Sequence, residues 1–249
     1  MIEARGLSKH FQDKKRGEIR AVENVSFQCQ PGKIYGLLGA NGAGKTTTLR
    51  MLATILEPTG GTAIVCGHDV VEHPEKVRSC VGFLSTATAL YPRLSAQEMV
   101  EYFGRLNALD EPTLKKRVDD VFQRLHMHDF RDRRCDKLST GQKQKTSIAR
   151  TLVHDPPVMI FDEPTTGLDV MTARTIISFI ADCRDRGKTV IFSTHIMSEV
   201  ERLCDNIGII HGGKLLAEGT VPALRAKYSE HNLEEIIVKV VGPLANSEA

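Results

Sequence analysis

A glycine-rich stretch between two apolar segments constrains this chain more than any other feature of its sequence. Residues 34–38 before it are apolar and residues 48–56 after it are mostly apolar, so the order predicts a buried strand, a tight turn and a helix. Glycine adopts backbone angles closed to other residues, which lets main-chain N–H groups approach an anion at the start of the helix. The pattern therefore predicts a phosphate-binding loop. Its residues are Gly39, Ala40, Asn41, Gly42, Ala43, Gly44, Lys45, Thr46 and Thr47.

Two side chains of this loop are suited to phosphate chemistry. Lys45 would reach the β- and γ-phosphates of a nucleotide, and the Thr46 hydroxyl would ligate Mg²⁺. The alternative is a structural strand-to-helix turn with an incidental lysine. Lys45 and Thr46 stand in the register that a phosphate loop requires, so we expect a nucleotide with Mg²⁺ as cofactor.

Composition and charge favour an ordinary soluble protein. The chain has 249 residues and 41% apolar content, enough for a proper core in one domain or in a domain with a subdomain. The formal net charge of +2 gives no reason to expect a nucleic acid or an acidic membrane surface as partner. The six cysteines are far apart in the sequence and form no Cys-x-x-Cys pair, so we expect reduced thiols in a cytosolic protein.

The sequence offers no segment suited to cross a membrane. No run approaches the roughly 20 apolar residues that span a bilayer, and the first residues lack an apolar signal segment. We therefore expect no direct insertion into lipid. If the function concerns a membrane, another chain must supply the membrane-spanning part.

The order of the elements predicts an α/β chain with a helical insertion. Residues 2–30 favour an antiparallel flap of two or three strands before the nucleotide core. Ser95 and Glu98 have the spacing of a capping box and open a stretch without strand signal, which we interpret as an inserted α-helical subdomain over about residues 95–155. The helices expected there cover about residues 95–109 and 112–127.

Strands and helices alternate again after this insertion. Continuous apolar runs joined by helices are typical of strands buried on both faces of a mostly parallel sheet. A hairpin is expected at Gly212 and Gly213, and the main domain is expected to cover residues 1–228, with a short C-terminal tail over residues 229–249. The predicted strands are residues 157–161, 189–192 and 207–210, the predicted helices are residues 170–186 and 198–204, and the tail contains a short helix and an apolar segment at 236–241.

Asp162 and Glu163 follow one of these buried strands directly. The carboxyl ends of strands are where open α/β sheets bind their ligands, and successive side chains of a strand point to opposite faces. One carboxylate can thus hold Mg²⁺ beside Thr46 while the other positions or deprotonates a water near the γ-phosphate. Two acidic residues at a strand end are a weak signal alone and become strong beside a phosphate loop.

A third stretch, Leu138-Ser139-Thr140-Gly141-Gln142, resembles the signature motif of ATP-binding-cassette (ABC) ATPases. In that family the motif reads Leu-Ser-Gly-Gly-Gln and opens a helix whose N-terminus binds the γ-phosphate of ATP held by the other subunit. Thr140 replaces the first glycine here, while Ser139 can still cap the helix and Gly141 still permits close approach of a phosphate. The resemblance implies that Ser139, Gly141 and Gln142 contact ATP.

The resemblance covers about residues 2–219 and implies roles at the phosphates. Carried over by position, Asp162 is the Mg²⁺ carboxylate and Glu163 is the catalytic base. Lys45 and His195 are implied to act with Glu163 at the γ-phosphate. A lone histidine at a strand end is usually structural, and His195 is assigned to the site because of the motifs around it.

Two further assignments concern the base and the partner subunit. Phe11 matches the aromatic residue that stacks on adenine, although by pattern alone it is equally a core phenylalanine. Asp169 matches a loop that contacts the opposite subunit. One departure stands out, since the family usually has a glutamine where this chain has Thr86, and Gln97 lies too far along to replace it.

The resemblance implies a P-loop NTPase of the ABC ATPase fold that hydrolyses ATP. Such a subunit forms an ATP-dependent head-to-tail dimer and drives a separate integral membrane permease from the cytoplasmic face. Residues 139–141, 155–157 and 167–169 resemble ABC-2-type exporters, especially the NatA-type sodium-export group, so export of sodium ions or drugs is expected.

Two other classes of function stay open. One is a soluble ABC ATPase that acts as an assembly or regulatory factor without transport. The other is a nucleotide or small-molecule kinase, which would share the phosphate loop but leave the signature motif and His195 unexplained.

Overall fold

The computed structural model describes residues 1–15, 17–85 and 89–245 of the chain. Thr86, where the family's glutamine was expected, lies outside these residues. A six-stranded sheet forms the centre. Its five strands other than β10 run parallel to one another, as the continuous apolar runs predict, and β10 pairs antiparallel with β9. The strand order is β10 (Lys214–Gly219), β9 (Asn206–His211), β3 (Ile34–Leu38), β8 (Thr189–Thr194), β7 (Val158–Asp162) and β6 (Val81–Ser85).

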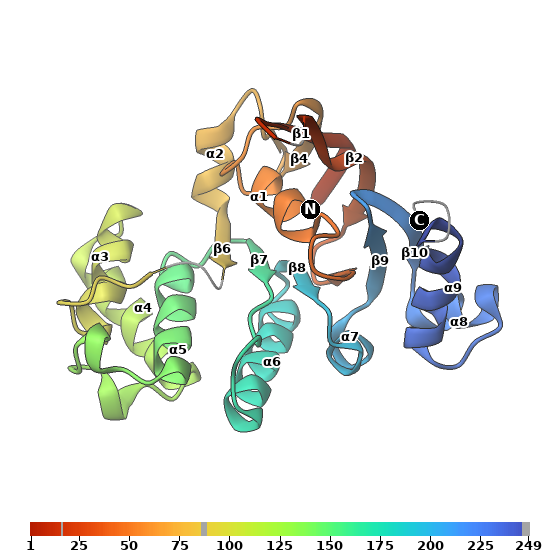
Figure 1. The fold of residues 1–249 in the computed structure, drawn as a ribbon. Coiled ribbons are helices and arrows are strands. Elements are labelled where there is room, and N and C mark those ends of the chain that lie inside the picture. Colours follow the sequence, from red (N-terminus) through yellow and green to blue (C-terminus); the bar gives the residue numbers. More distant parts are fainter. Residues whose placement is uncertain (16, 86–88, 246–249) are drawn as a thin grey trace.

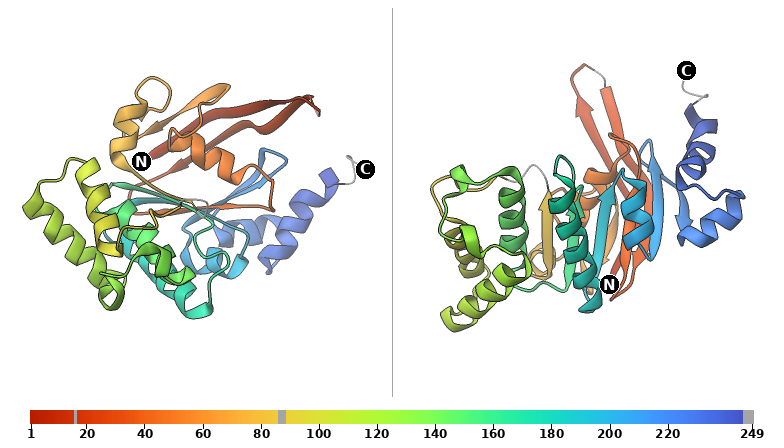
Figure 2. Two further views of the ribbon diagram at one scale, coloured as in Figure 1. Left: turned by 60° about the vertical axis from the view of Figure 1, so that its left-hand side comes forward. Right: turned by 90° about the horizontal axis from the view of Figure 1, so that it is seen from below.

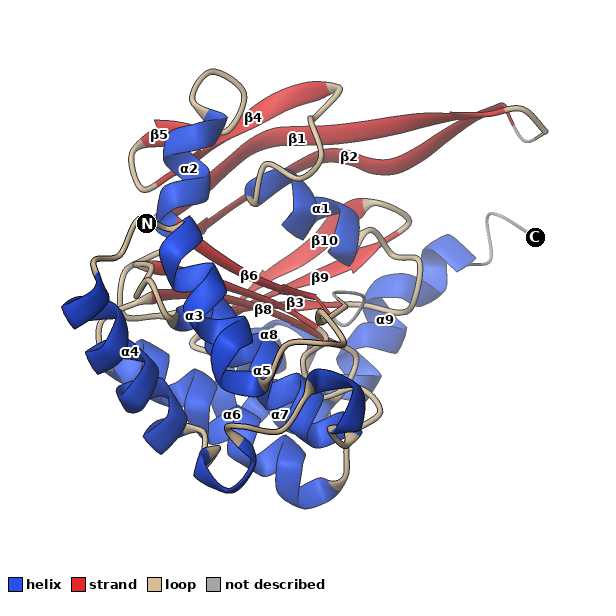
Figure 3. Cartoon of the chain, turned by 90° about the vertical axis from the view of Figure 1, so that its left-hand side faces the viewer, coloured by secondary structure: helices blue, strands red, loops and turns tan. Residues whose placement is uncertain are grey.

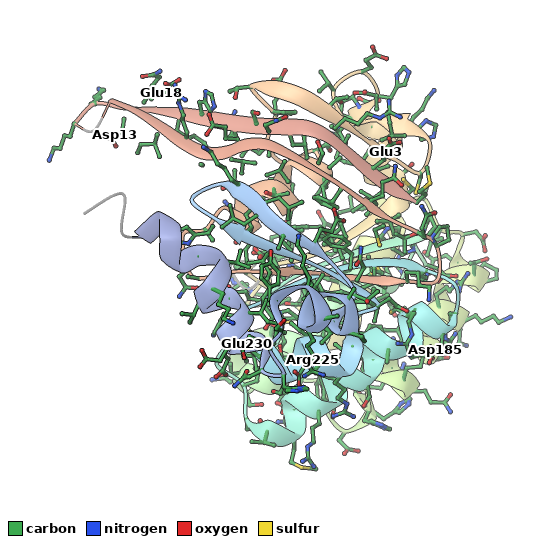
Figure 4. The ribbon with its side chains drawn as sticks, turned by 90° about the vertical axis from the view of Figure 1, so that its right-hand side faces the viewer. Glu3, Asp13, Glu18, Asp185, Arg225 and Glu230 are labelled. Atoms are coloured by element: carbon green, nitrogen blue, oxygen red, sulfur yellow. The ribbon has the colours of Figure 1, made fainter. Side chains whose placement is uncertain are left out.

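A second, antiparallel sheet is built mainly by the N-terminal part of the chain. Its strands β1 and β2 extend together as a long arm beyond the rest of the sheet (Figure 3), and Asp13 and Glu18 lie near the far end of this arm (Figure 4). The arm pairs Phe11 with Ile19. The strand order is β2 (Gly17–Cys29), β1 (Ile2–Asp13), β4 (Gly60–Val65) and β5 (His68–Asp69).

Helix α1 (Lys45–Leu52) lies between the two sheets (Figure 3). Its Leu49 and Leu52 are fully buried in one apolar cluster with Ile2 of β1 and Leu37 of β3. The start of α1, where its first N–H groups have no partner within the helix, is thereby fixed at the end of β3. A short helix and strand that the sequence did not predict, α2 (Pro74–Cys80) and β5, complete this part of the fold.

The predicted helical insertion is present beside the β6 edge of the central sheet (Figures 1 and 2). Its helices end before the predicted limits of 109 and 127, because Asn107 and Leu125 take the C-cap positions. The Ser95–Glu98 capping box is formed as predicted. The helices are α3 (Ala96–Leu106), α4 (Glu111–Arg124) and α5 (Thr140–Leu152).

Two more helices, α6 (Val170–Asp185) and α7 (Met197–Leu203), connect the parallel strands. One buried apolar cluster runs through α6, the central sheet and the helical insertion, with Phe122, Ile148, Phe192 and Ile180 among its members. The insertion therefore shares a continuous core with the sheet.

The chain ends in two helices, α8 (Val221–Tyr228) and α9 (Leu233–Ala245), beside the β10 edge (Figures 1 and 2). The expected apolar segment at 236–241 is part of α9. Leu233 and Ile236 of this helix are buried against Leu224 and the β9–β10 hairpin, so the region expected as a tail packs on the sheet edge. Among residues 1–15, 17–85 and 89–245, no helix has the length and apolar character to cross a membrane.

Candidate nucleotide site

The phosphate loop joins β3 to α1 and borders an open pocket of about 270 Å³. Two glycines are needed there. A Cβ at Gly39 would lie 2.3 Å from the Ile210 carbonyl oxygen, and one at Gly44, whose φ is 108°, would lie 2.7 Å from the Ala21 carbonyl oxygen. The pocket is lined by Ala21, Asn41, Gly42, Gly44, Lys45, Thr46, Thr47, Asp162 and Glu163.

Lys45 places a buried ammonium group in this pocket. Its side chain is only 4% exposed. Its Nζ donates to the carbonyl oxygens of Gly39 at 2.7 Å and Ala40 at 3.0 Å, and pairs with Glu163 Oε1 at 3.1 Å. Among the described contacts, Glu163 supplies the only formal negative charge paired with Lys45, and an anionic ligand could take its place.

Asp162 is the last residue of β7 and joins the loop to the next strand. Its Oδ1 accepts from Thr46 Oγ1 at 3.1 Å and from Ser193 Oγ at 2.7 Å, and its side chain is buried. Thr46 and Asp162 thus present neighbouring hydroxyl and carboxylate oxygens at the pocket. Hard oxygen donors of this kind are the ligands that Mg²⁺ prefers, so the pair fits that ion.

Glu163 directly follows β7 and has a left-handed backbone, with φ of 49°. Its N–H donates to the carbonyl oxygen of Ser193 at 3.1 Å and to Ser193 Oγ at 3.0 Å. Its carboxylate pairs with Lys45 and lies 3.4 Å from His195 Nδ1, and it accepts from Thr166 Oγ1 at 3.3 Å. Ser193 therefore contacts both acidic residues.

The charge of Glu163 follows from these contacts. Partial burial alone would raise the pKa of its carboxyl group, but the hydrogen bond and charge of Lys45, together with the charge of His195 and the Thr166 hydroxyl, outweigh it and hold the pKa below its usual value. Glu163 is therefore an ionised carboxylate that accepts hydrogen bonds. It can orient a water molecule and accept a proton from it.

The signature motif lies at the start of α5 and does not line this pocket. Ser139 caps the helix by accepting from the Gln142 N–H at 3.3 Å, and Gln142 Oε1 accepts from the Ser139 N–H at 3.1 Å. Gly141 faces α6, since a Cβ there would lie 2.9 Å from Thr172 Oγ1. In a single chain, Gln142 is thus a capping residue and Gly141 a packing residue.

Asp169 also lies outside the pocket lining, where it caps α6. It accepts from the N–H groups of Met171 and Thr172 and from Thr172 Oγ1 at 2.7 Å, and these hydrogen bonds, that of the Thr172 hydroxyl above all, lower the pKa of Asp169. Gln144 Nε2 of α5 donates to the Pro164 carbonyl oxygen at 2.8 Å. The signature helix and the segment after Glu163 are therefore in contact within one chain.

The remaining predicted residues differ in their positions. Ala43 is buried below the loop, and His195 is exposed but touches Glu163. Phe11 is 39% exposed on the β1–β2 arm, with Lys9 Nζ 5.5 Å from its ring centroid, and does not line the pocket. Its role at adenine therefore stays a prediction.

Sequence reasoning did not single out Ser193, Thr166, Thr172 or Gln144. Ser193 could have been found from its position directly after the predicted strand 189–192 and two residues before His195, where a buried hydroxyl needs a partner. The contacts of the other three join segments whose pairing is not visible in the sequence.

The fold and the pocket define a P-loop ATP hydrolase. Its phosphate loop joins strand β3 to helix α1, and its two carboxylates lie at the carboxyl end of β7 in the same sheet. Within that class the chain belongs to the ABC transporter family. The model of that family, described as "ABC transporter", matches residues 22–166. The predicted family, fold class and ATP hydrolase activity are thereby confirmed.

Two relatives support this assignment. The chain is 43% identical over 237 residues to the ABC transporter ATP-binding protein NatA of Bacillus subtilis (strain 168), covering 95% of each. It is 38% identical over 230 residues to the Nod factor export ATP-binding protein I of Paraburkholderia xenovorans (strain LB400), covering 92% of this chain and 74% of that protein.

Solved structures agree with the fold. One described as an ATP-binding subunit of an ABC transporter has a TM-score of 0.87 and 26% identity, covering 97% of this chain and 99% of its own. Another, described as a dimeric ATP-binding cassette in a post-hydrolysis state bound to ADP and Pi, has a TM-score of 0.81 and 25% identity, covering 88% of this chain and 98% of its own.

Proposed function

We propose that this chain binds ATP with Mg²⁺ and uses its hydrolysis to energise a separate integral membrane permease, from the cytoplasmic face, in an exporter of the ABC-2 type. The relative named for Nod factor export supports the direction of transport. Sodium ions or drugs are the substrates expected from the sequence. The permease, which meets the substrate, decides between them.

The observation that carries this proposal is the meeting of four side chains in one pocket. Lys45 and Thr46 come from the loop before α1, and Asp162 and Glu163 come from the end of β7. The contacts Lys45–Glu163 at 3.1 Å and Thr46–Asp162 at 3.1 Å join the two segments. A phosphate-binding cation, a pair of Mg²⁺ ligands and a proton acceptor are thus adjacent.

Each side chain has one task in this scheme. Lys45 binds the terminal phosphates and releases Glu163 when they arrive. Thr46 and Asp162 would hold Mg²⁺, which neutralises charge on the phosphate oxygens when bound. Glu163 orients the attacking water and accepts its proton, and His195, 3.4 Å away, helps to fix the Glu163 carboxylate beside the γ-phosphate.

A second copy of the chain would complete the site. Ser139, Gly141 and Asp169 lie outside the pocket of their own chain, while the N-terminus of α5 is an anion-binding end of a helix. We propose a head-to-tail dimer in which each α5 N-terminus meets the γ-phosphate held by the other Lys45. The dimeric description of a structural neighbour supports this arrangement.

The test combines chemistry with co-purification. The purified chain should release free phosphate from ATP in the presence of Mg²⁺ without any acceptor, whereas a kinase would require an acceptor. Tagged chain isolated from membranes of its source should bring with it a polytopic membrane protein. Isolation with soluble proteins alone would favour the assembly-factor alternative and would overturn the transport proposal.

A further inference from the structure

The end of strand β8 carries three consecutive polar residues whose side chains take different partners. Ser193 is fully buried, and its Oγ donates to Asp162 Oδ1 at 2.7 Å and accepts from the Glu163 N–H at 3.0 Å. His195, two residues further on, contacts the Glu163 carboxylate at 3.4 Å. Thr194 stands between them, and successive side chains of a strand point to opposite faces. Its hydroxyl group therefore takes its partners elsewhere.

The Thr194 hydroxyl group joins the end of β8 to helix α7. Its Oγ1 accepts from the Ile196 N–H at 3.0 Å and donates to Glu199 Oε2 at 2.7 Å. A hydrogen bond from a hydroxyl oxygen to the N–H two residues further on closes a local turn, and here that turn encloses His195. The backbone on both sides of His195 is thus held by one buried side chain.

Helix α7 gives this turn a fixed anchor. Its Val200 and Leu203 are buried, and Val200 packs in one apolar cluster with Leu38 of β3. Glu199 directly precedes Val200, and its N–H donates to the Ile196 carbonyl oxygen at 3.2 Å. The Glu199 carboxylate therefore accepts the Thr194 hydroxyl from a helix that is packed on the sheet.

His195 depends on this support because its side chain is not fixed by packing. It is 43% exposed, and the 3.4 Å between its Nδ1 and the Glu163 carboxylate is longer than a normal charge-assisted hydrogen bond. A displacement of about 1 Å at a reacting centre can cost roughly 10²-fold in rate. The place of the imidazole is therefore set by the backbone that carries it.

We propose that Thr194 and Glu199 are positioning residues for ATP hydrolysis, which hold His195 at the Glu163 carboxylate where the γ-phosphate is bound. This inference rests on the role proposed above for His195 in the nucleotide site. Neither Thr194 nor Glu199 lines the pocket, so both act through His195. The scheme requires the hydroxyl group of Thr194 and an acceptor oxygen at position 199, but it does not require the charge of Glu199.

The central variant is Thr194→Val, which keeps the shape of the side chain and removes its hydroxyl group. We expect kcat for ATP hydrolysis by the whole purified chain to fall roughly tenfold while the KM for ATP changes by less than about twofold, because positioning acts on the reacting geometry. Thr194→Ser keeps the hydroxyl group and should stay near the wild-type kcat.

The partner on α7 gives a parallel pair of variants. Glu199→Ala should lower kcat as Thr194→Val does, whereas Glu199→Gln keeps an acceptor oxygen and should stay near the wild-type kcat. Circular dichroism would verify that each variant folds. Because Glu199 is only half-buried, Glu199→Ala carries the test if Thr194→Val does not fold. A kcat of Glu199→Gln as low as that of Glu199→Ala would overturn the requirement for an acceptor oxygen.

Thr189→Val is the matched control for the loss of a buried hydroxyl group. Thr189 is buried at the start of the same strand, and its Oγ1 accepts from the N-terminal ammonium group of Met1 at 3.1 Å. The substitution should lower the midpoint of urea unfolding, as Thr194→Val does, and leave kcat unchanged. An equal fall of kcat in both variants would show a loss of stability in place of positioning and would overturn the proposal.

A double variant separates this inference from the role of His195 itself. His195→Ala should slow hydrolysis by roughly 10². Adding Thr194→Val should then cost less than about twofold, since the side chain that Thr194 positions is gone. An equal loss from Thr194→Val in both backgrounds would overturn the positioning role and leave the assignment of His195 standing. An unchanged rate in His195→Ala would instead overturn that assignment, and this inference with it.

Discussion

The phosphate-loop pocket and the N-terminus of α5 are both suited to bind phosphate, but they differ in what they contain before a nucleotide arrives. The pocket holds opposite charges in contact, with Lys45 paired to Glu163 at 3.1 Å. The start of α5 is closed upon itself by the Ser139–Gln142 capping box and by the packing of Gly141 on α6. The pocket therefore binds phosphate through charges that one chain supplies. The start of α5 has its own hydrogen bonds satisfied within the chain and is suited to contact a nucleotide held by another chain.

This difference predicts two kinds of variant. Changes in the pocket should alter nucleotide affinity or chemistry in each chain separately. Changes at the start of α5 should leave the affinity of the single chain unaltered and weaken the association of two chains.

Lys45→Ala should abolish ATP hydrolysis and strongly reduce ATP binding. The substitution removes the buried cation of the pocket and leaves the apolar core untouched, so the fold should persist. Phosphate release, nucleotide titration and circular dichroism are the measurements. A wild-type rate with normal ATP affinity would contradict the assignment of the pocket.

Glu163→Gln should slow hydrolysis by roughly 10²–10⁴ while ATP still binds, because glutamine keeps the shape and loses the proton acceptor. Unhydrolysed ATP should then hold two chains together by linkage, since each nucleotide contacts both. Size-exclusion chromatography should show a dimer with ATP and a monomer with ADP. A monomer in saturating ATP would argue against the shared site, unless the permease is needed for assembly.

Gly141→Ala should lower hydrolysis about tenfold without changing the ATP affinity of the monomer. The new Cβ would lie 2.9 Å from Thr172 Oγ1, so either the Thr172 side chain or the start of α5 must shift. Tenfold in rate corresponds to about 1.4 kcal/mol of activation free energy. A matched control is Gly242→Ala, which meets nothing within 4 Å and should have no effect.

The same variant offers a rescue experiment. Thr172→Ala removes the two atoms nearest to the new Cβ, Thr172 Oγ1 and Cγ2, so the double variant Gly141→Ala/Thr172→Ala should recover part of the lost activity. If Gly141→Ala weakened ATP binding in the single chain instead, the separation between pocket and helix start would be wrong.

The smallest effect concerns the pH dependence of stability. The lowered pKa of Glu163 means that its ionised form stabilises the fold above its unfolded pKa of about 4.3, and that this contribution disappears as the pH falls through the lower folded value. Glu163→Gln should therefore reduce the free energy of unfolding by about 0.5–1 kcal/mol at pH 7. Urea titrations should show the difference shrinking between about pH 5 and pH 3.

The parts of the fold that the sequence predicted are those with local causes. The strands β7 and β8 are continuous apolar runs, and the loop before α1 carries its glycines, Lys45 and Thr46 within one short segment. The helical insertion was visible because its capping box is local as well. Each of these patterns needs no knowledge of the rest of the chain.

The parts that were missed depend on which segments meet. Ser193 contacts Asp162 because β7 and β8 pair in the register Asp162–Ser193, and no property of either strand alone fixes that register. The packing of Gly141 on Thr172 likewise joins α5 to α6. For Phe11, the sequence allowed either stacking on adenine or packing in the core. The side chain is exposed on the arm, so its stacking on adenine stays a prediction.

The left-handed backbone of Glu163 has a consequence for evolution and engineering. A non-glycine residue at φ of 49° carries about 1–3 kcal/mol of strain, and the hydrogen bonds of its N–H to Ser193 hold it there. Asparagine or glycine would adopt this backbone more readily. A selection for heat resistance that ignores turnover would therefore favour replacing this carboxylate, and its persistence would be a record of selection for catalysis against stability.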